Sequence, residues 1–265
     1  MSSDSIRSRA TIACAAGLLL TVAAGARAGT YVEDFSDGVA NQFSLNGMQG
    51  DPPNRVFMPA EVSSGSLRLT GALNSWQATA ILADLDPGFA VPRFTASFSL
   101  AIGPGTAPPA DGLSFNFGQL SNTSDFGEEG PGGFNGLTIA ADVYDNGGGE
   151  APAVDVKVND AVVAGGHLAT NPYTNGAFVP VTVNLDADGT LDLTVAGNAL
   201  FSNLQTGFVP EAGDRFGWGA RTGGLNAETR IDDININTDA VPEPAAIGVL
   251  GLGSFGLLVR RRRRA

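Results

Sequence analysis

Acidic and amide side chains are densest between residues 126 and 158, and the stretch DVYDNGGGE within this region has the composition of a cation-binding loop. Calcium takes about six to eight oxygen ligands from carboxylates, amides and backbone carbonyls on a chain that can bend. Three consecutive glycines allow this loop to curl. The candidate calcium ligands are the side chains of Asp142, Asn146 and Glu150 and the backbone carbonyl of Tyr144. The alternative is a glycine-rich turn whose acids are only solvated.

Residues suited to hydrolytic chemistry are sparse. A glycosidase needs two facing carboxylates about 5 Å apart or more, whereas the adjacent Glu128 and Glu129 point to opposite faces of an extended chain. His167 is the sole histidine and Cys14 the sole cysteine, so neither a Ser-His-Asp triad nor a thiol nucleophile has support. We therefore predict a protein that binds a ligand and is not an enzyme.

Alternating apolar and polar residues in the middle of the chain predict β-strands. The segment FTASFSLAI, residues 94–102, places five apolar side chains on one face, and the turn sequence DADG joins strands expected at 181–185 and 191–195. Gly, Pro, Asn and Asp separate about a dozen such strands. Further strands are expected at 66–70, 76–82, 113–117, 136–144, 153–158, 215–221 and 229–236. The pattern predicts an all-β domain over residues 29–240, built as a sandwich of two stacked antiparallel sheets.

The N-terminal end carries the pattern of an export signal. A basic stretch with Arg7 and Arg9 precedes an apolar run over residues 10–25, and the small residues Ala26 and Ala28 follow it. This order predicts a secretory signal peptide over residues 1–28 that is cut after Ala28.

The C-terminal end, residues 241–265, consists of Pro-Glu-Pro, an apolar run over 245–259 and five consecutive arginines. As a helix, the apolar run reaches about 22 Å, against roughly 30 Å for the hydrocarbon core of a bilayer. Arginines that follow an apolar span stay on the cytoplasmic side. The segment therefore predicts a short hydrophobic helix that holds the exported chain in the membrane.

Removing both ends leaves a strongly acidic domain. Residues 29–240 keep seven of the 15 basic residues and 25 of the 27 acids, which gives a net charge of −18 against −12 for the whole chain. Nucleic-acid binding needs a positive surface, so no nucleic-acid partner is expected. Divalent cations and neutral glycans are compatible with this charge, and acidity also keeps an exported protein soluble. The domain has no cysteine, so no disulfide stabilises it.

Three segments resemble the core of the L-type (legume-like) lectins, which have a concanavalin A-like jelly-roll sandwich. They are ADGLSFNFG (110–118), GGFNGLTIAADVYDN (132–146) and AVDVKVN (153–159). The segment FGWGARTGGLNAETRIDDININ (216–237) resembles the closing strands of concanavalin A-like and laminin-G-like domains in exported bacterial proteins. The resemblance covers most of 30–238 and implies the same sandwich.

The resemblance also implies a carbohydrate-binding site. In these lectins the aspartate of the ADG loop accepts hydrogen bonds from sugar hydroxyls, and Asp111 stands at this position. A glycine-rich loop donates a backbone N–H to the sugar, and Gly132 or Gly133 matches it. An asparagine that touches both the sugar and calcium matches Asn146. The alternative for Asp111 is an ordinary turn aspartate before glycine.

The implied metal site departs from the family in part. The resemblance assigns Asp142, Tyr144, Asn146 and Glu150 as calcium ligands, as the loop composition does. The family's glutamate two residues before the first of these is replaced by Ala140. Only a single calcium ion is therefore expected, without the second, transition metal.

The C-terminal end resembles the PEP-CTERM sorting signal. Its parts are Pro242, Glu243 and Pro244, the apolar span, and the arginine cluster that begins with Arg260 and Arg261. The resemblance implies an exosortase-type processing protease, cleavage near the Pro-Glu-Pro motif, and transfer to the cell surface or extracellular matrix.

Together these patterns predict an exported, surface-sorted protein that binds carbohydrate or exopolysaccharide, with calcium as a candidate cofactor. Two alternatives stay open: a non-catalytic structural or interaction protein of the cell surface or matrix, and a glycoside hydrolase with dispersed acids.

Overall fold

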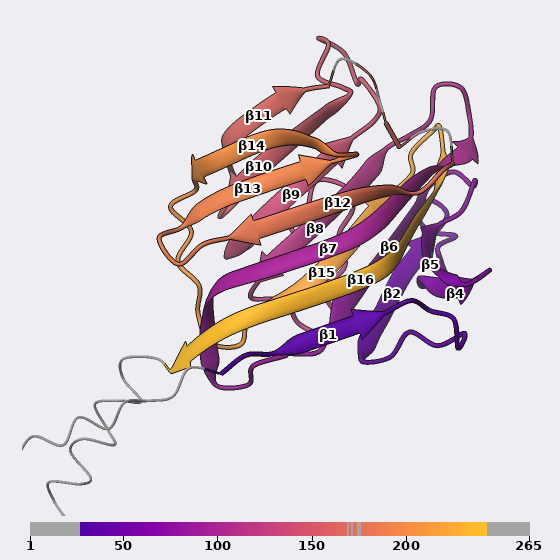
Figure 1. The fold of residues 1–265 in the computed structure, drawn as a ribbon. Helices are drawn as coiled ribbons and strands as arrows, with labels where there is room; N and C mark the ends of the chain where they lie inside the picture. Colours follow the sequence, from indigo (N-terminus) through magenta and orange to yellow (C-terminus); the bar gives the residue numbers. More distant parts are fainter. Residues whose placement is uncertain (1–26, 169, 171, 174–175, 243–265) are drawn as a thin grey trace, which may run out of the picture.

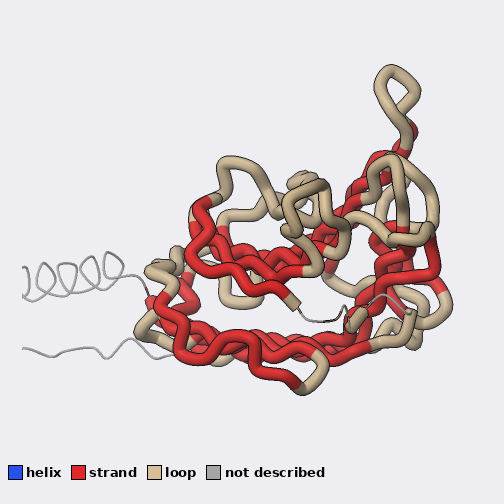
Figure 2. The backbone as a smooth tube through the Cα atoms, turned by 90° about the horizontal axis from the view of Figure 1, so that it is seen from above, coloured by secondary structure: helices blue, strands red, loops and turns tan. Residues whose placement is uncertain are grey.

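The alternating segments form two β-sheets that lie face to face, with loops at the ends of the layers (Figures 1 and 2). The computed structural model describes residues 27–168, 170, 172–173 and 176–242. These residues form 16 strands, and they include no helix long and apolar enough to cross a membrane. The predicted all-β sandwich of two antiparallel sheets is confirmed. The predicted sorting helix lies outside the described residues, as does most of the predicted signal peptide.

The first sheet has the order β14-β13-β12-β7-β16-β5-β4, and β1 pairs with the later part of β16. Its strands are β1 (Thr30–Glu33), β4 (Glu61–Ser63), β5 (Ser66–Thr70), β7 (Phe89–Gly105), β12 (Val179–Leu185), β13 (Thr190–Val195), β14 (Asn198–Gln205) and β16 (Ala227–Pro242).

The second sheet has the order β11-β10-β9-β8-β15-β6-β2-β3. Its strands are β2 (Phe43–Gln49), β3 (Val56–Phe57), β6 (Trp76–Leu82), β8 (Gly112–Gly118), β9 (Gly136–Asp142), β10 (Ala153–Val158), β11 (Ala161–His167) and β15 (Arg215–Arg221). Strands β5, β6, β10 and β15 coincide with the expected segments, whereas β9 ends two residues earlier than expected.

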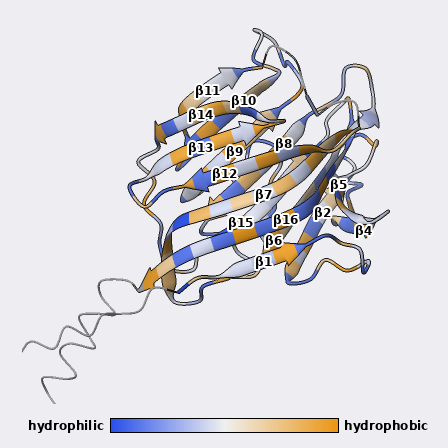
Figure 3. Cartoon of the chain, viewed as in Figure 1, coloured by the Kyte–Doolittle hydropathy of each residue, from blue (hydrophilic) through white to orange (hydrophobic). Residues whose placement is uncertain are grey.

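The core lies between the facing surfaces of the two sheets, where the apolar residues of the alternating strands pack together. Figure 3 shows hydrophobic and hydrophilic residues following one another along these strands. All five side chains predicted to face inward from 94–102 are buried. Aromatic rings fill the centre: Phe98 stacks on Phe115 with ring centroids 5.8 Å apart, and Phe115 meets Trp218 edge-on at 5.6 Å. Burial of such rings removes large apolar surfaces from water and is the main stabilising contribution in a domain without disulfides.

The outer face of the second sheet is covered by the β8–β9 connection, residues 119–135. A separate apolar cluster of Ile81, Leu120, Phe126 and Phe134 fixes this loop on the sheet. Because the loop covers β8 from outside, every residue of that strand is buried, although alternate residues are polar. The 119–135 loop therefore carries side chains across the outer face of the sheet, among them Glu128, which lies near the end of β15.

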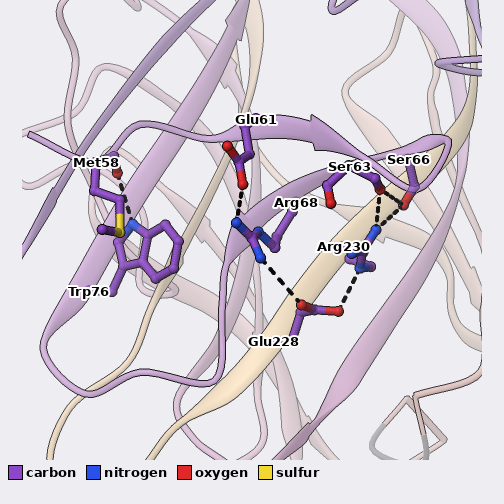
Figure 4. A network of polar contacts seen from close by, with 8 residues as sticks. All are labelled: Met58, Glu61, Ser63, Ser66, Arg68, Trp76, Glu228 and Arg230. Carbon is purple, nitrogen blue, oxygen red and sulfur yellow. Dashed lines mark hydrogen bonds and ion pairs between the residues drawn. The ribbon is translucent and has the colours of Figure 1, made fainter. Parts of the chain in front are cut away.

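Polar side chains connect β4, β5 and β16 at the other edge of the sandwich (Figure 4). Arg68 pairs with Glu61 and lies 3.8 Å from Glu228, which also binds Arg230 at 2.6 Å. The Arg68 guanidinium lies 5.6 Å from the ring centroid of Trp76. The two arginines and two glutamates of this network neutralise one another. The network therefore connects the strands and offers no net charge that would attract a ligand.

The longest strands, β7 and β16, pair along almost their whole lengths in the first sheet (Figure 1). At one end Gly105 of β7 pairs with Ala227, close to the loop that leads into β8. At the other end Pro242 pairs with Phe89. The ladder thus extends two residues into the segment predicted to be the sorting signal.

Candidate functional site

Asp111 lies immediately before β8, where backbone hydrogen bonds hold it from both sides. Its N–H donates to the carbonyl of Arg221, the last residue of β15, at 3.0 Å. Its carbonyl accepts from the N–H of Val143, just after β9, at 2.9 Å. The peptide bond between Ala110 and Asp111 is cis. The carboxylate is therefore positioned by the ends of three neighbouring strands, β9, β8 and β15.

Glu128 reaches the same place on the 119–135 loop. Phe126 lies directly above Gly219 of β15, where a Cβ atom would overlap its ring, so glycine makes room for it. The next carbonyl, that of Gly127, accepts a hydrogen bond of 2.7 Å from the Ser114 hydroxyl. These two contacts fix the loop on the sheet and carry the Glu128 side chain to the end of β15.

Asp111, Glu128 and Arg221 form the candidate site, which we call the acid–arginine cluster. Arg221 Nε lies 3.5 Å from Asp111 Oδ2, and its Nη1 lies 3.9 Å from Glu128 Oε1. Asp111 is 8% exposed and Glu128 7%, whereas half of the Arg221 side chain is accessible. One cation thus faces two buried acids and remains open to solvent.

Burial governs the electrostatics of this cluster. It raises the pKa of the Glu128 carboxyl to about 7, with Arg221 acting in the opposite direction. Burial likewise raises the pKa of Asp111, and the neighbouring Arg221 lowers it. At neutral pH, Glu128 therefore exchanges between a form that donates a hydrogen bond and a form that only accepts one.

Two oxygens of the cluster lack a hydrogen-bond partner among the described residues: Asp111 Oδ2 and Glu128 Oε2. A buried acceptor without a donor is costly, so such groups usually meet water or a ligand. Gly223 lies against Asp111, because a Cβ atom there would come within 3.3 Å of Asp111 Oδ2. The arrangement suits a small ligand with several hydroxyl groups, which donate and accept hydrogen bonds at once.

The candidate calcium loop follows β9 at the same end of the sheet. Asp142 pairs in register with Gly112, which places it beside Asp111. Its Oδ1 accepts from the N–H of Tyr144 at 3.0 Å. Burial, with a smaller contribution from the carboxylates of Glu129, Glu150 and Asp111, raises the pKa of Asp142 to about 6, although the hydrogen bond from the Tyr144 N–H acts in the opposite direction.

The acids further along this loop bind its own backbone. Asn146 N–H donates to Glu150 Oε1 at 2.7 Å, and Asp145 accepts from the N–H groups of Gly147 and Gly149. Across the described ranges, no group of three acidic, histidine or cysteine side chains converges as a metal site would require. The donor types suit calcium, but Asp145 and Glu150 are occupied by amide groups in this arrangement.

The glycine-rich loop lies apart from the cluster. Gly132 and Gly133 precede β9 at the end where Gly136 pairs with Gly118, whereas Asp111 lies at the opposite end of β8, about 20 Å away. The N–H of Gly133 donates to Asp160 in the β10–β11 turn. The structure therefore brings Asp111 and Asp142 together and does not bring these glycines to them.

The predicted processing residues occupy the two ends of the described chain. Ala28 is exposed between Arg27 and Gly29, and Pro242 ends β16. The other predicted sorting residues, Glu243, Pro244, Arg260 and Arg261, lie outside the described residues.

Sequence patterns gave no role to Arg221 or Glu128. Arg221 ends a strand as an ordinary polar residue would, and Glu128 depends on how the long loop crosses the sheet. One signal could have located Glu128. The glycines of RFGWGAR leave room for an aromatic ring on the outer face of that strand, and Phe126, two residues before Glu128, is such a ring.

The sandwich has the concanavalin A-like fold of the L-type lectins. It is similar to winged bean acidic lectin complexed with methyl-alpha-D-galactose, with a TM-score of 0.60 and 19% identity over 81% of this chain and 99% of that lectin. It is similar to the carbohydrate recognition domain of Emp47p, with a TM-score of 0.59 and 18% identity over 79% and 94% of the two chains. For the Ca2+/Man-bound exoplasmic/lumenal domain of VIP36, the TM-score is 0.57 and the identity 15%, over 80% and 96%.

The C-terminal end has its own match. Residues 240–264 match the PEP-CTERM protein-sorting motif, which indicates export with C-terminal membrane anchoring before processing. No curated protein matches the chain in sequence.

Proposed function

We propose that the protein is a non-catalytic carbohydrate-binding protein, exported and sorted to the cell surface or matrix, whose ligand binds at the acid–arginine cluster. The observation that carries the proposal is that Asp111 Oδ2 and Glu128 Oε2 are buried without a hydrogen bond, beside the half-exposed guanidinium of Arg221. The similarity to solved lectins supports the ligand class, since these lectins include complexes with methyl-alpha-D-galactose and with mannose. The sorting motif supports the destination and an exosortase-type protease as processing partner.

Each member of the cluster has a distinct role in this proposal. Asp111 accepts hydrogen bonds from two neighbouring sugar hydroxyls. Arg221 donates to a sugar oxygen from its exposed side and keeps the two acids from repelling one another. Glu128 accepts in its charged form and donates in its neutral form, so it fits a hydroxyl or an acetal oxygen.

Calcium is part of the proposal as a ligand of the adjoining loop. Asp142, Glu150, Asn146 and the Tyr144 carbonyl would hold it, and it would fix the loop beside Asp111. Binding would require Glu150 to leave the N–H of Asn146, which it accepts from in the described arrangement. Sugar recognition by Asp111, Glu128 and Arg221 needs no step through the metal.

Absence of catalysis follows in this proposal from the position of Arg221. Its guanidinium lies close to both buried carboxylates, so the two acids share one cation and do not face each other across a substrate. A glycosidase keeps its two acids on opposite sides of the scissile bond. Incubation with the bound glycan should therefore release no reducing ends.

Glycan-array binding followed by titration calorimetry tests the proposal on the exported protein. D111A should lower affinity by about 10- to 100-fold, because a hydrogen bond to a charged acceptor contributes about 1.5 to 3 kcal/mol. G223A should also weaken binding by covering Asp111. G224A is the matched control, since a Cβ atom there meets nothing within 4 Å.

Absence of glycan binding with and without calcium would refute the carbohydrate role and favour a structural protein of the surface. Equal affinity of D111A and the unmodified protein would refute the site while leaving the ligand class standing.

A further inference from the structure

Asp86 is a fully buried carboxylate at the end of the sandwich where the described chain begins, with no exposed surface. Its Oδ2 accepts a hydrogen bond of 2.5 Å from the Thr238 hydroxyl, and its Oδ1 has no hydrogen-bond partner among the described residues. The cation that faces it is Arg27, whose Nε lies 3.7 Å from Oδ1 and whose side chain is 52% exposed. A buried carboxylate without a cation is strongly unfavourable, so a positive group beside Asp86 stabilises the folded chain.

The predicted signal-peptide cleavage removes that cation. Cleavage after Ala28 separates Arg27 from the domain and makes Gly29 the first residue. Hydrolysis of this peptide bond consumes one water and leaves a carboxylate on Ala28 and an α-ammonium group on Gly29. Cleavage thus removes the positive charge of Arg27 and creates a new one on the backbone nitrogen of Gly29.

Gly29 is already in contact with Asp86. It is buried, its N–H donates to Thr238 Oγ1 at 2.9 Å, and a Cβ atom on it would lie 2.7 Å from Asp86 Oδ2 and 3.0 Å from Oδ1. The nitrogen and Cβ of one residue are about 2.5 Å apart, so the Gly29 nitrogen lies within about 5.5 Å of both carboxylate oxygens. At this range an ammonium and a carboxylate stabilise each other's charged forms.

We propose that Asp86 and Thr238 form a binding site for the α-ammonium group that signal-peptide removal creates on Gly29. One ammonium hydrogen keeps the bond to Thr238, and the others face the carboxylate, including the unpartnered Oδ1. The site requires glycine, because any side chain at position 29 would collide with Asp86 Oδ2 and Thr238 Oγ1. Export processing therefore exchanges the Arg27 ion pair for an internal one and stabilises the mature sandwich.

The proposal uses the cleavage position predicted from the sequence, and N-terminal sequencing of the secreted protein tests this first. A mature chain that begins at any residue other than Gly29 would overturn the proposal.

We would compare the thermal unfolding of two chains that both begin at Gly29 and differ only at its nitrogen. One has a free α-amino group, and the other has an N-acetyl group. The acetyl group mimics the Ala28 peptide bond but carries no charge. The free form should melt about 5 to 15 °C higher, as expected for retaining a buried ion pair. In the D86N background the two forms should melt together. Equal melting with Asp86 present, or a difference that persists in D86N, would overturn the proposal.

Acylation of the free amine is a second measurement that needs no substitution at Asp86. The chain that begins at Gly29 should react about tenfold more slowly at neutral pH than a chain that begins at Ala28, because the paired ammonium holds its proton. Lys157, the only lysine of the sequence, is the internal reference in both chains. Equal rates for the two α-amines would contradict the pairing.

Discussion

Replacing Glu128 with glutamine should remove a pH-dependent cost from the folded protein. A glutamate has an ordinary pKa of 4.5, and burial raises that of Glu128 to about 7. Between these values the folded state holds a proton that the unfolded state has lost, so rising pH lowers the free energy of unfolding. The favourable contribution of the protonated form is fully present below pH 4.5 and is lost as the pH rises through 7.

The magnitude follows from the pKa difference. Each unit corresponds to about 1.4 kcal/mol, so between pH 5 and 7.5 the unmodified protein should lose about 2 kcal/mol of stability relative to E128Q. For a domain of this size that is about 4 to 8 °C in Tm. Burial also raises the pKa of Asp142 and Asp214 to about 6, but these acids affect both proteins equally. The difference between the two proteins therefore isolates Glu128.

Urea unfolding followed by tryptophan fluorescence measures this difference, since Trp76 and Trp218 are both buried. E129Q is the control, because it removes the adjacent but exposed carboxyl, and its stability difference from the unmodified protein should change with pH less than that of E128Q. The assigned burial of Glu128 would be refuted if the difference in unfolding free energy between E128Q and the unmodified protein did not change with pH. It would also be refuted if the unmodified protein became more stable than E128Q as the pH rises.

Two further predictions concern the neighbouring elements. G219A should lower the free energy of unfolding by about 2 kcal/mol, because a Cβ atom at this position overlaps the Phe126 ring and lies 2.7 Å from the Phe126 carbonyl oxygen. Stability equal to that of G224A would contradict this packing. Calcium should raise the Tm with a midpoint of about 0.1 to 1 mM, reversed by EDTA, since Glu150 must first leave the N–H of Asn146. A micromolar midpoint, or no shift at 20-fold higher calcium (about 20 mM), would show that the loop does not behave in this way.

The inward faces of the long strands could be predicted because their period of two is clean. FTASFSLAI, WQATAIL and RFGWGAR each place apolar residues on one side, and all three lie in strands whose inward residues are buried. The edge strands β3, β4, β11 and β14 were not predicted, since they are short or largely exposed and need no alternation. Trp76 and Trp218, which lie in WQATAIL and RFGWGAR, are buried in the core.

The site could be predicted only where local register determines it. Asp111 and Asp142 lie together because Gly112 and Asp142 are cross-strand partners, and a short strand pair transmits sequence spacing directly into space. Glu128 depends instead on the path of the 119–135 loop, which long-range contact between Phe126 and Gly219 determines. Local patterns carry no information about such a contact until the order of strands in the sheet is known.

The paired strands β7 and β16 have a mechanical consequence. Strand β16 has 16 residues and extends about 50 Å, from the end of the sandwich near Asp111 to Pro242, where the sorting segment begins. Under the proposed function, a ligand bound at the cluster and a membrane that holds the C-terminal end would pull in opposite directions along the strand axis. Antiparallel hydrogen bonds lie perpendicular to that axis, so the β7–β16 ladder is loaded in shear and its bonds share the force instead of opening one at a time.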